Sequence, residues 1–382
     1  MIRVLLPFAL LPATLFAQSF QNNYGAGKYE EGVAVVVDQT GITSVVRHYR
    51  AGYGYGIQLL RTSLTGTSPV TIDIPLPGAA FPQSAILADG DIVICGSIIP
   101  TGRFDHDALL LRVTTSGTIT WSWTGNNPAG EEQFLCVDML DDGFAAGGVW
   151  RHGADSDALL ARFNGTGALQ WQDHYGTEAD DQVRGIAHDA GGIVAVGAKH
   201  FALGEEADKD VFAVRTDLLG TQQWVRTWGG LQHDAAFDVV ARSDGSFVWA
   251  GYTDSFPIGD TTLSGDRFRH VYAMAINLTG DSIWGATYGD TMLNRECWSL
   301  LPATNNEVLF AGETELGHRS NAFTIRSSAT GTLLWERTYP LERTDRLQDM
   351  LLMPDGGFIG TGKCFGPQSG QVLLLRKNSV GQ

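Results

Sequence analysis

A glycine that recurs along the whole chain is the feature that most limits what this chain can fold into. The steps from one copy to the next are 51, 50, 53, 60, 51 and 50 residues. The copies are Gly66, Gly117, Gly167, Gly220, Gly280, Gly331 and Gly381. Such regular self-similarity is the signature of a repeat protein, in which each unit buries its apolar surface against its neighbours. The 382 residues are therefore interpreted as seven copies of one unit rather than as two or three unrelated domains.

Two further residue types keep phase with this glycine. A tryptophan follows it by four positions in five copies: Trp121, Trp171, Trp224, Trp284 and Trp335. An arginine precedes it by five positions in six copies, and Ala275 holds that position in the remaining copy. The six arginines are Arg61, Arg112, Arg162, Arg215, Arg326 and Arg376. A residue found in nearly every unit indicates a structural role. We expect each tryptophan to pack between units, and each arginine to lay its stem on apolar surface and bond a carboxylate or carbonyl.

Each repeat has room for four short strands. An Asp-Gly pair between two apolar runs predicts a hairpin turn, because this turn needs residues that tolerate positive φ; it occurs at Asp89-Gly90, Asp142-Gly143, Asp244-Gly245 and Asp355-Gly356. A further glycine is predicted to end the second strand, at Gly96, Gly197, Gly251, Gly312 and Gly362. The strands are apolar on both faces, so each sheet should be packed between two others.

These features predict an all-β, seven-bladed β-propeller of four-stranded blades. The seventh repeat stops at Gln382, where its fourth strand should begin, and the segment 19–25 matches that strand, with Phe20 in the tryptophan position. We therefore expect the N-terminal strand to complete the last blade and close the ring, which removes two exposed sheet edges. The predicted blades are 26–77, 78–128, 129–179, 180–232, 233–292, 293–342, and 343–382 with 18–25.

The first seventeen residues resemble a secretory signal peptide. Arg3 precedes an apolar run that ends in Ala17, and the run is too short to span a bilayer. We expect residues 1–17 to be removed and residues 18–382 to be exported, to the periplasm or outside the cell. No later segment is apolar enough to insert in a membrane. The net charge of −16 argues against a nucleic-acid partner, since a basic stripe is absent.

Four cysteines lie far apart in the chain, and no two form a CxxC pair: Cys95, Cys136, Cys297 and Cys364. An oxidising compartment would permit disulfides between them. All except Cys364 lie within apolar strand-like runs, which favours buried free thiols.

Several segments resemble the delta-60-type repeats of secreted bacterial propellers. The resemblance rests on the segment 355–362 and on Thr166-Gly167 followed by Trp171 and Tyr175. It covers the whole mature chain and implies a fold but no particular activity. The Thr-Gly-x-x-x-Trp element also resembles the tryptophan-docking motif of pyrroloquinoline quinone propellers. Those enzymes need two adjacent cysteines, which this chain lacks, so we assign the packing role and no cofactor.

The candidate site lies on the face that carries the loops between second and third strands. These loops are long and differ between repeats, and variable loops on a rigid scaffold commonly carry function. They bring together aromatic, arginine and histidine side chains that suit a glycan, a peptide or an acidic small molecule; ordinary solvated loops are the alternative. The candidate ligand-binding residues are Arg103, His106, Trp150, Arg151, His152, His200, Tyr252, Arg267, Arg269, His270, Arg295 and Arg319. The loop 259–266 has oxygen ligands suited to calcium but lacks the spacing of a known calcium loop, and we assign no metal.

The sequence contains no catalytic motif in a fitting context. We therefore interpret the protein as an exported, non-catalytic β-propeller that binds a ligand, or a partner such as a cell-surface protein, through its variable loop face. One alternative is a propeller enzyme, either a carbohydrate hydrolase or lyase or a quinone-type dehydrogenase. A carboxylate pair for glycoside hydrolysis would be recognised in space rather than in sequence. A second alternative is a structural or adhesive component of a cell-surface assembly.

Overall fold

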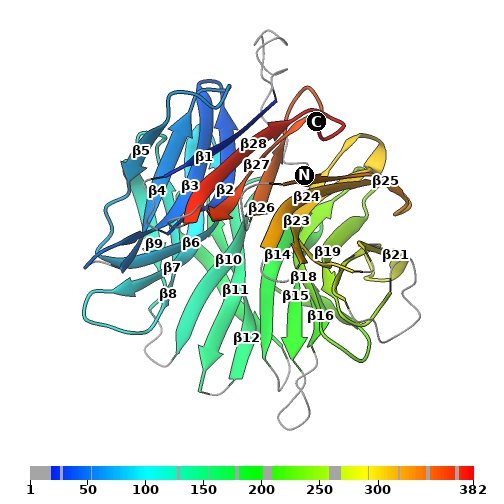
Figure 1. Ribbon diagram of the computed structural model, residues 1–382. Helices are drawn as coiled ribbons and strands as arrows, with labels where there is room; N and C mark the ends of the chain where they lie inside the picture. The colour runs from blue at the N-terminus through cyan, green and yellow to red at the C-terminus, as the bar shows by residue number, and fades with distance from the viewer. Residues whose placement is uncertain are drawn as a thin grey trace.

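The computed structural model is an all-β ring of seven four-stranded antiparallel sheets (Figure 1). It describes residues 19–25, 29–52, 54–126, 130–153, 155–176, 180–200, 209–257, 268–290, 292–316, 319–340, 345–365 and 370–382. Within these ranges the one helical element is a short 3₁₀ turn, η2 (Thr304–Asn306). No helix in the described ranges has the length and apolarity needed to cross a membrane. The expected propeller of seven four-stranded blades is confirmed.

In every blade the first strand lines the central channel and the fourth strand lies outermost. The first, channel-lining strands are β2 (Glu30–Asp38), β6 (Gly78–Ala88), β10 (Glu131–Leu140), β14 (Asp181–Asp189), β18 (Asp234–Ala241), β22 (Asn294–Pro302) and β26 (Asp345–Leu352). The second strands are β3 (Gly41–Arg50), β7 (Asp91–Pro100), β11 (Gly143–His152), β15 (Gly192–His200), β19 (Phe247–Thr253), β23 (Val308–Leu316) and β27 (Phe358–Phe365). The third strands are β4 (Gly54–Thr62), β8 (Asp107–Val113), β12 (Asp155–Asn164), β16 (Lys209–Thr216), β20 (His270–Ile276), β24 (Arg319–Ser327) and β28 (Gly370–Lys377). The outermost strands are β5 (Val70–Asp73), β9 (Ile119–Thr124), β13 (Leu169–Tyr175), β17 (Gln222–Trp228), β21 (Ser282–Tyr288), β25 (Leu333–Tyr339) and β1 (Phe20–Tyr24).

The two ends of the chain close the ring together. Strand β1 pairs antiparallel with β28, with Phe20 opposite Arg376, and so becomes the outermost strand of the seventh blade. In Figure 1 the dark blue β1 lies beside the red β28. The Ser19 hydroxyl also donates to the backbone carbonyl of Gln382 at 2.6 Å. The predicted closure by the N-terminal strand is confirmed. It gives β28, the third strand of the last blade, a hydrogen-bonded partner on its outer edge.

The recurrent tryptophan and glycine meet across each boundary between blades. A Cβ on Gly331 would lie 2.7 Å from the ring of Trp284, which belongs to the preceding blade. Gly331 has φ +80°, a conformation that L side chains rarely adopt. The Trp284 indole also donates to the Ala329 carbonyl at 2.9 Å. Phe20 packs on Gly66 in the same way at the closure. Glycine is thus required at this turn for two reasons: its φ is positive, and the aromatic ring packed on it leaves no room for a Cβ.

The recurrent arginine bonds an acidic residue near the first hairpin of its own blade. Arg162 reaches Asp142 at 2.8 Å, and Arg376 reaches Asp355 at 2.6 Å. Arg162 also donates to the carbonyl of Leu218 in the next blade at 2.7 Å. The expected carboxylate and carbonyl partners are confirmed, and the arginines tie the third strand both to its own hairpin and to the neighbouring blade.

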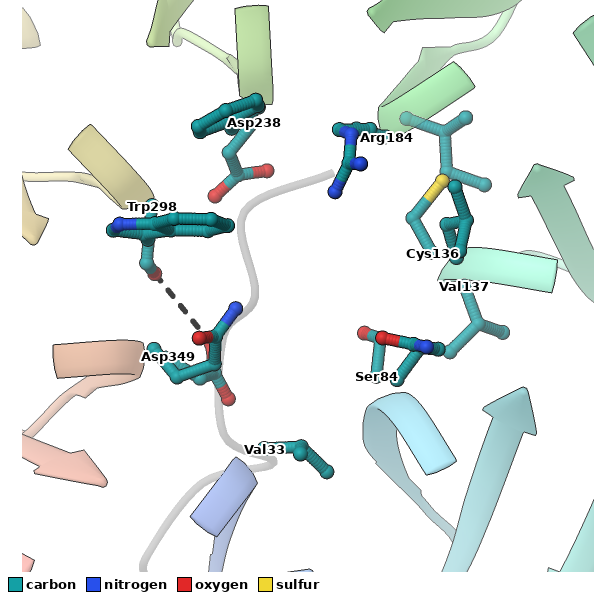
Figure 2. A pocket seen from close by; sticks show the side chains of 14 residues that line it. Val33, Ser84, Cys136, Val137, Arg184, Asp238, Trp298 and Asp349 are labelled. Carbon is teal, nitrogen blue, oxygen red and sulfur yellow. Dashed lines mark hydrogen bonds between the residues drawn. The ribbon is translucent and has the colours of Figure 1, made fainter. Parts of the chain in front are cut away.

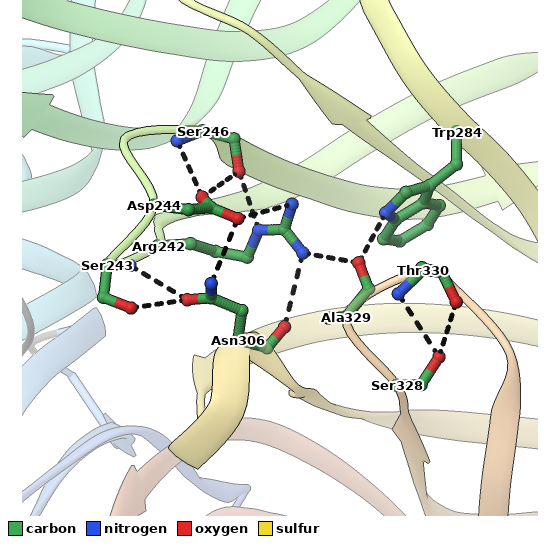
Figure 3. Close-up of polar contacts among 9 residues, drawn as sticks. All are labelled: Arg242, Ser243, Asp244, Ser246, Trp284, Asn306, Ser328, Ala329 and Thr330. Carbon is green, nitrogen blue, oxygen red and sulfur yellow. Dashed lines mark hydrogen bonds and ion pairs between the residues drawn. The ribbon is translucent and has the colours of Figure 1, made fainter.

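Blade 5 has Ala275 at the position of the recurrent arginine, but an arginine from another strand makes the same contacts. Arg242, at the end of β18, pairs with Asp244 at 3.3 Å and donates to the carbonyl of Ala329 in the next blade at 2.7 Å (Figure 3). Ala329 precedes the recurrent Gly331 by two positions, just as Leu218 precedes Gly220. A guanidinium from another strand therefore supplies the same bond that Arg162 makes, and this explains how blade 5 tolerates Ala275.

The glycine predicted to end the second strand does not end it. Strand β7 continues past Gly96 to Pro100, and β15 continues past Gly197 to His200. A Cβ on Gly197 would lie 1.9 Å from the carbonyl oxygen of Gln182 on the first strand. The prediction was wrong because a glycine inside a strand can also mark close approach of another backbone. Here that approach comes from a β-bulge in the first strand of the blade.

All four cysteines are buried, and none of them forms a disulfide bond. They lie in the apolar layers between blades, and burial raises the pKa of the Cys95 thiol to about 12. The prediction of buried free thiols is confirmed, and Cys364 shares this burial because it lies within β27.

Candidate functional site

A ring of seven bulged residues lines the central channel, one from the first strand of each blade. In every blade the pairing between first and second strands skips one residue, and these residues are Val33, Gln83, Leu135, Arg184, Phe237, Trp298 and Gln348. All seven border one cavity of about 80 Å³ (Figure 2). Bulges re-aim side chains and recur next to functional sites. The channel thus receives one side chain per blade whose identity the repeat does not dictate.

The two sides of this cavity differ in chemistry. Blades 1 to 3 contribute side chains that are small or uncharged, including Val33, Gln83 and Leu135. Blades 4 to 6 contribute Arg184 and the two large aromatic residues at the bulge. Figure 2 shows Arg184 reaching into the cavity from the side opposite Trp298. A ligand in the channel would therefore find its cationic and aromatic contacts in blades 4 to 6.

Three bulge side chains, together with Arg346 near the start of β26, form a stacked row across blades 4 to 7. The Phe237 and Trp298 rings stack with centroids 4.5 Å apart and planes inclined by 25°. The Arg184 guanidinium lies 5.2 Å from the Phe237 centroid, and the Arg346 guanidinium lies 5.1 Å from the Trp298 centroid. A cation over an aromatic face within about 6 Å is attracted by the ring quadrupole. The row, which we call the aromatic ladder, holds each member in a fixed orientation.

Polar side chains just after the bulges fasten the first strands to one another. Asp238 accepts the backbone N–H of Leu300 at 2.8 Å, and Asp349 accepts that of Val35 at 2.8 Å. The Ser299 hydroxyl accepts the N–H of Met350 at 3.2 Å. Each bond joins one blade to the next, so the carboxylates of Asp238 and Asp349 have structural partners although they border the cavity.

Ion pairs surround the mouth of the channel on the face where the first strands begin. Glu31 bonds Arg47 at 2.6 Å and also bonds Arg346. Burial alone would raise the pKa of Glu31, but these two guanidinium groups lower it to about 2. Arg346 thus takes part both in this ion-pair network and in the aromatic ladder. Neighbouring Glu313 differs, because burial raises its pKa.

Two of the predicted ligand-binding residues adjoin the ladder. Tyr252 packs edge-on to Phe237 with centroids 5.6 Å apart, and the Arg269 guanidinium lies 3.9 Å from the Tyr252 centroid. Arg269 pairs with Asp254 at 2.9 Å and with Glu296. Tyr252 is buried, and this burial raises its pKa. The structure therefore joins Arg269 and Tyr252 to the channel wall.

Two other predicted residues are too buried to face the loops. His270 is 0% exposed and Arg295 is 4% exposed. Arg295 pairs with Glu336 at 2.7 Å and lies over the Phe323 ring. These side chains are part of the packed interior of blades 5 and 6, so we remove them from the candidate ligand contacts.

The predicted residues of blades 2 and 3 form two separate groups away from the ladder. Arg103 pairs with Asp107 at 2.8 Å and with Asp105, and His106 bonds Ser97 at 2.9 Å. In blade 3 the Trp150 ring lies between two imidazoles, with centroids 4.2 Å from His152 and 4.1 Å from His174. Arg151 is exposed next to Glu131. The loop-face candidates that the structure describes in blades 2 and 3 therefore lie in groups separate from the ladder.

The remaining candidates divide by what the structure describes. Arg319 is exposed at the start of β24. Arg267 and the possible calcium loop 259–266 lie outside the described residues, as does the side chain of His200. In the described part of the chain, no group of three or more His, Cys, Asp or Glu side chains is arranged to hold a metal ion.

Sequence reasoning missed the bulge ring, including Arg184, Phe237 and Trp298. These residues lie in first strands, whereas the predicted site lies in the loops between second and third strands. The available signal was the recurrent glycine inside the second strand, because Gly197, Gly251 and Gly312 each lie opposite a bulge. That glycine identifies which first-strand residue is turned into the channel.

Three solved structures are similar to this chain. YCF48 bound to a D1 peptide covers 94% of this chain and 95% of its own, with 13% identity and a TM-score of 0.52. The polysaccharide lyase Uly1 covers 91% and 90%, with 11% identity and a TM-score of 0.51. BBS1N in complex with ARL6DN covers 94% and 96%, with 10% identity and a TM-score of 0.51. Identities this low show the shared propeller fold alone. No family model and no curated protein matches the sequence.

Proposed function

We propose that this protein is an exported, non-catalytic binding scaffold that holds its ligand at the channel mouth, against blades 4 to 7. The observation that carries the proposal is the aromatic ladder of Arg184, Phe237, Trp298 and Arg346. Nothing in the repeat requires Arg184, Phe237 or Trp298, since the same bulge position holds Val33 and Leu135 in other blades. Aromatic and arginine side chains are also the residues that contribute most to binding at protein interfaces.

Two further arguments support this reading. The propellers YCF48 and BBS1N have structures in complex with a peptide and a protein partner respectively, so this fold serves as a scaffold for partners. The signal-like residues 1–17 support export, and the repeat motifs support membership of the delta-60 type of secreted bacterial propeller. Mass spectrometry of the protein recovered from its native host tests export. We expect a mature chain that begins at Gln18, and a chain that retains residues 1–17 would contradict it.

The binding test begins with a ligand screen of the full chain. Thermal unfolding is recorded with peptides, oligosaccharides, calcium, EDTA and pyrroloquinoline quinone, because a ligand that binds only the native state raises its stability. The ligand found is then titrated against Trp298→Ala and Phe237→Ala. Each change should weaken binding by about 2 kcal/mol, or roughly thirtyfold in Kd.

The matched control is Leu135→Ala, which alters the same bulge position on the other side of the cavity. It should bind as the wild type does. Equal weakening by all three variants would contradict the assignment to blades 4 to 7. Chemical conversion of the bound ligand would contradict the non-catalytic reading and favour the hydrolase or lyase alternative.

A further inference from the structure

Four aromatic rings follow one another across blades 1 and 2, on the face that carries the loops between second and third strands. Tyr49 and Tyr55 lie directly opposite each other at the ends of β3 and β4, with ring centroids 5.5 Å apart. The Tyr55 centroid lies 5.2 Å from that of Phe81 in β6, which in turn lies 5.0 Å from that of His106. These four residues, which we call the tyrosine patch, therefore form one continuous series of rings across the boundary between the two blades.

The two tyrosines are the exposed part of this patch. Tyr49 is 41% exposed and Tyr55 is 36% exposed, whereas Phe81 and His106 are half-buried. The Ser97 hydroxyl bonds His106 Nδ1 at 2.9 Å and fixes the imidazole. Single exposed aromatic side chains are common, but adjoining ones mark a contact surface. Tyrosine suits such a surface because it offers a large contact area and has few rotatable bonds to immobilise.

The charged side chains at the two ends of the patch are paired with one another. At the tyrosine end Arg50 lies 3.9 Å from Asp73. At the histidine end Arg103 lies 2.8 Å from Asp107 and also pairs with Asp105. A charged ligand would have to compete with these pairs, so the patch favours a ligand without net charge.

Both ends nevertheless offer hydrogen-bond acceptors as well as donors. The side chains of Asp73 and Asp105 are 51% and 38% exposed, and the guanidinium groups of Arg50 and Arg103 supply N–H groups beside them. Sugar hydroxyls can use both kinds of group, because each hydroxyl donates and accepts. A proline-rich peptide also packs on exposed tyrosines, but proline has no N–H to donate to these carboxylates.

The rings themselves match the apolar part of a sugar. One face of a pyranose ring carries C–H groups, and the negative face of an aromatic ring attracts these positively polarised groups. Because Tyr49 and Tyr55 adjoin each other, they can contact successive sugars of one chain. The patch thus combines aromatic faces with neutral surroundings and with hydrogen-bonding groups of both kinds.

We infer that the tyrosine patch is a second binding site, which takes a neutral glycan chain. The sugar rings pack on Tyr49 and Tyr55, and their hydroxyls bond the polar side chains at the two ends of the patch. This site belongs to blades 1 and 2, whereas the aromatic ladder belongs to blades 4 to 7. The inference goes beyond the proposed function and does not depend on it.

Calorimetric titration of the full chain with neutral hexasaccharides tests this site. The probes are cellohexaose, laminarihexaose, xylohexaose and mannohexaose, and we expect at least one of them to bind. Tyr55→Ala should weaken binding of the tightest probe about tenfold, as loss of an aromatic contact does at other interfaces. Tyr49→Ala should weaken it severalfold. Tyr55→Phe keeps the ring and should retain nearly the affinity of the wild type.

Leu231→Ala is the matched control, because its side chain is also exposed, in the loop between β17 and β18 on the same face. It removes an exposed apolar side chain outside the patch and should leave the Kd unchanged. Tyr55→Leu keeps apolar bulk without an aromatic face, and it should bind as weakly as Tyr55→Ala. Thermal unfolding identifies which variants are folded, and either substitution at Tyr55 suffices for the test.

Two results would overturn the site: no binding of any hexasaccharide by the wild type, or equal binding by wild type and Tyr55→Ala. Tighter binding of decaproline than of every hexasaccharide would overturn the glycan assignment in favour of a proline-rich partner. These failures are separable from that of the proposed function. If Trp298→Ala weakens binding of the screened ligand while Tyr55→Ala changes no affinity, the scaffold function stands without this second site.

Discussion

The outer and inner strands of the ring follow opposite rules. On the outside the same contacts recur in blade after blade, for example Trp284 on Gly331 and Trp171 on Gly220. On the inside the bulge position is equally regular in its backbone, yet its side chain ranges from Val33 to Trp298. Repetition therefore identifies the residues that hold blades together. Variation at a geometrically constant position identifies the residues free to serve a ligand.

The inner ring contains a second contrast, between its two sides. Blades 1 to 3 present mainly apolar or neutral bulge residues, whereas blades 4 to 7 carry the aromatic ladder. Both sides rest on the same bulge geometry, so the backbone does not explain the difference. The contrast is a matter of side-chain chemistry imposed on a symmetric frame, as expected when function is added to a common fold.

The largest expected effect compares an outer tryptophan with an inner one. Trp284→Ala removes the ring packed on Gly331 and the bond to Ala329, and we expect the free energy of unfolding to fall by about 3–5 kcal/mol. Trp298→Ala removes mainly a stacking contact with Phe237, and we expect a loss of about 1–2 kcal/mol. Denaturant unfolding of both variants measures the difference. Similar losses would break the distinction between outer and inner strands.

The next effect concerns the pH dependence of Glu31 at the channel mouth. Its pKa of about 2 lies below the ordinary value of 4.5, so the folded state favours the ionised form. The resulting stability, about 3 kcal/mol, is present above pH 4.5 and is lost as the pH falls toward 2.

Glu31→Gln should therefore lower the unfolding free energy at pH 7 and flatten its acid dependence between pH 4.5 and 2. The control is Glu131→Gln, whose more exposed pair with Arg151 at 3.5 Å should contribute less than about 1 kcal/mol. Thermal unfolding across this pH range measures both. An unchanged acid slope in Glu31→Gln would show that its ion pairs with Arg47 and Arg346 do not stabilise the fold.

The smallest effect tests whether Arg242 replaces the recurrent arginine that blade 5 lacks. Arg162→Ala and Arg242→Ala should each cost about 2 kcal/mol, because each removes an ion pair and a bond to the next blade. The double variant Ala275→Arg with Arg242→Ala returns the arginine to its usual strand and should recover part of the loss in chemical denaturation. No recovery would mean that blade 5 has abandoned the shared arrangement.

The sequence allowed most of the fold to be predicted, because the structural residues repeat. The phased Gly331 and Trp284 indicated the blade boundary, and Phe20 in the tryptophan position indicated ring closure. The interior glycines such as Gly197 were misread, since a strand end and a bulge partner give the same residue. Of the predicted site, Tyr252 and Arg269 lie beside the ladder, whereas His270 and Arg295 are buried. Burial of these last two depends on neighbouring strands that sequence spacing does not specify.

By itself the sequence determined the number of blades, their strand order and the way the ring closes. Each of these follows from local periodicity and from contacts that every repeat must make with the next. Only the tertiary structure decided that Arg184, Phe237, Trp298 and Arg346 stack in one row. These residues are far apart in the chain, and each belongs to a different repeat. Arg184, Phe237 and Trp298 meet because the bulges turn one side chain per blade toward a common axis, and Arg346 joins them from two positions before the bulge of blade 7. That axis exists only once the ring is closed.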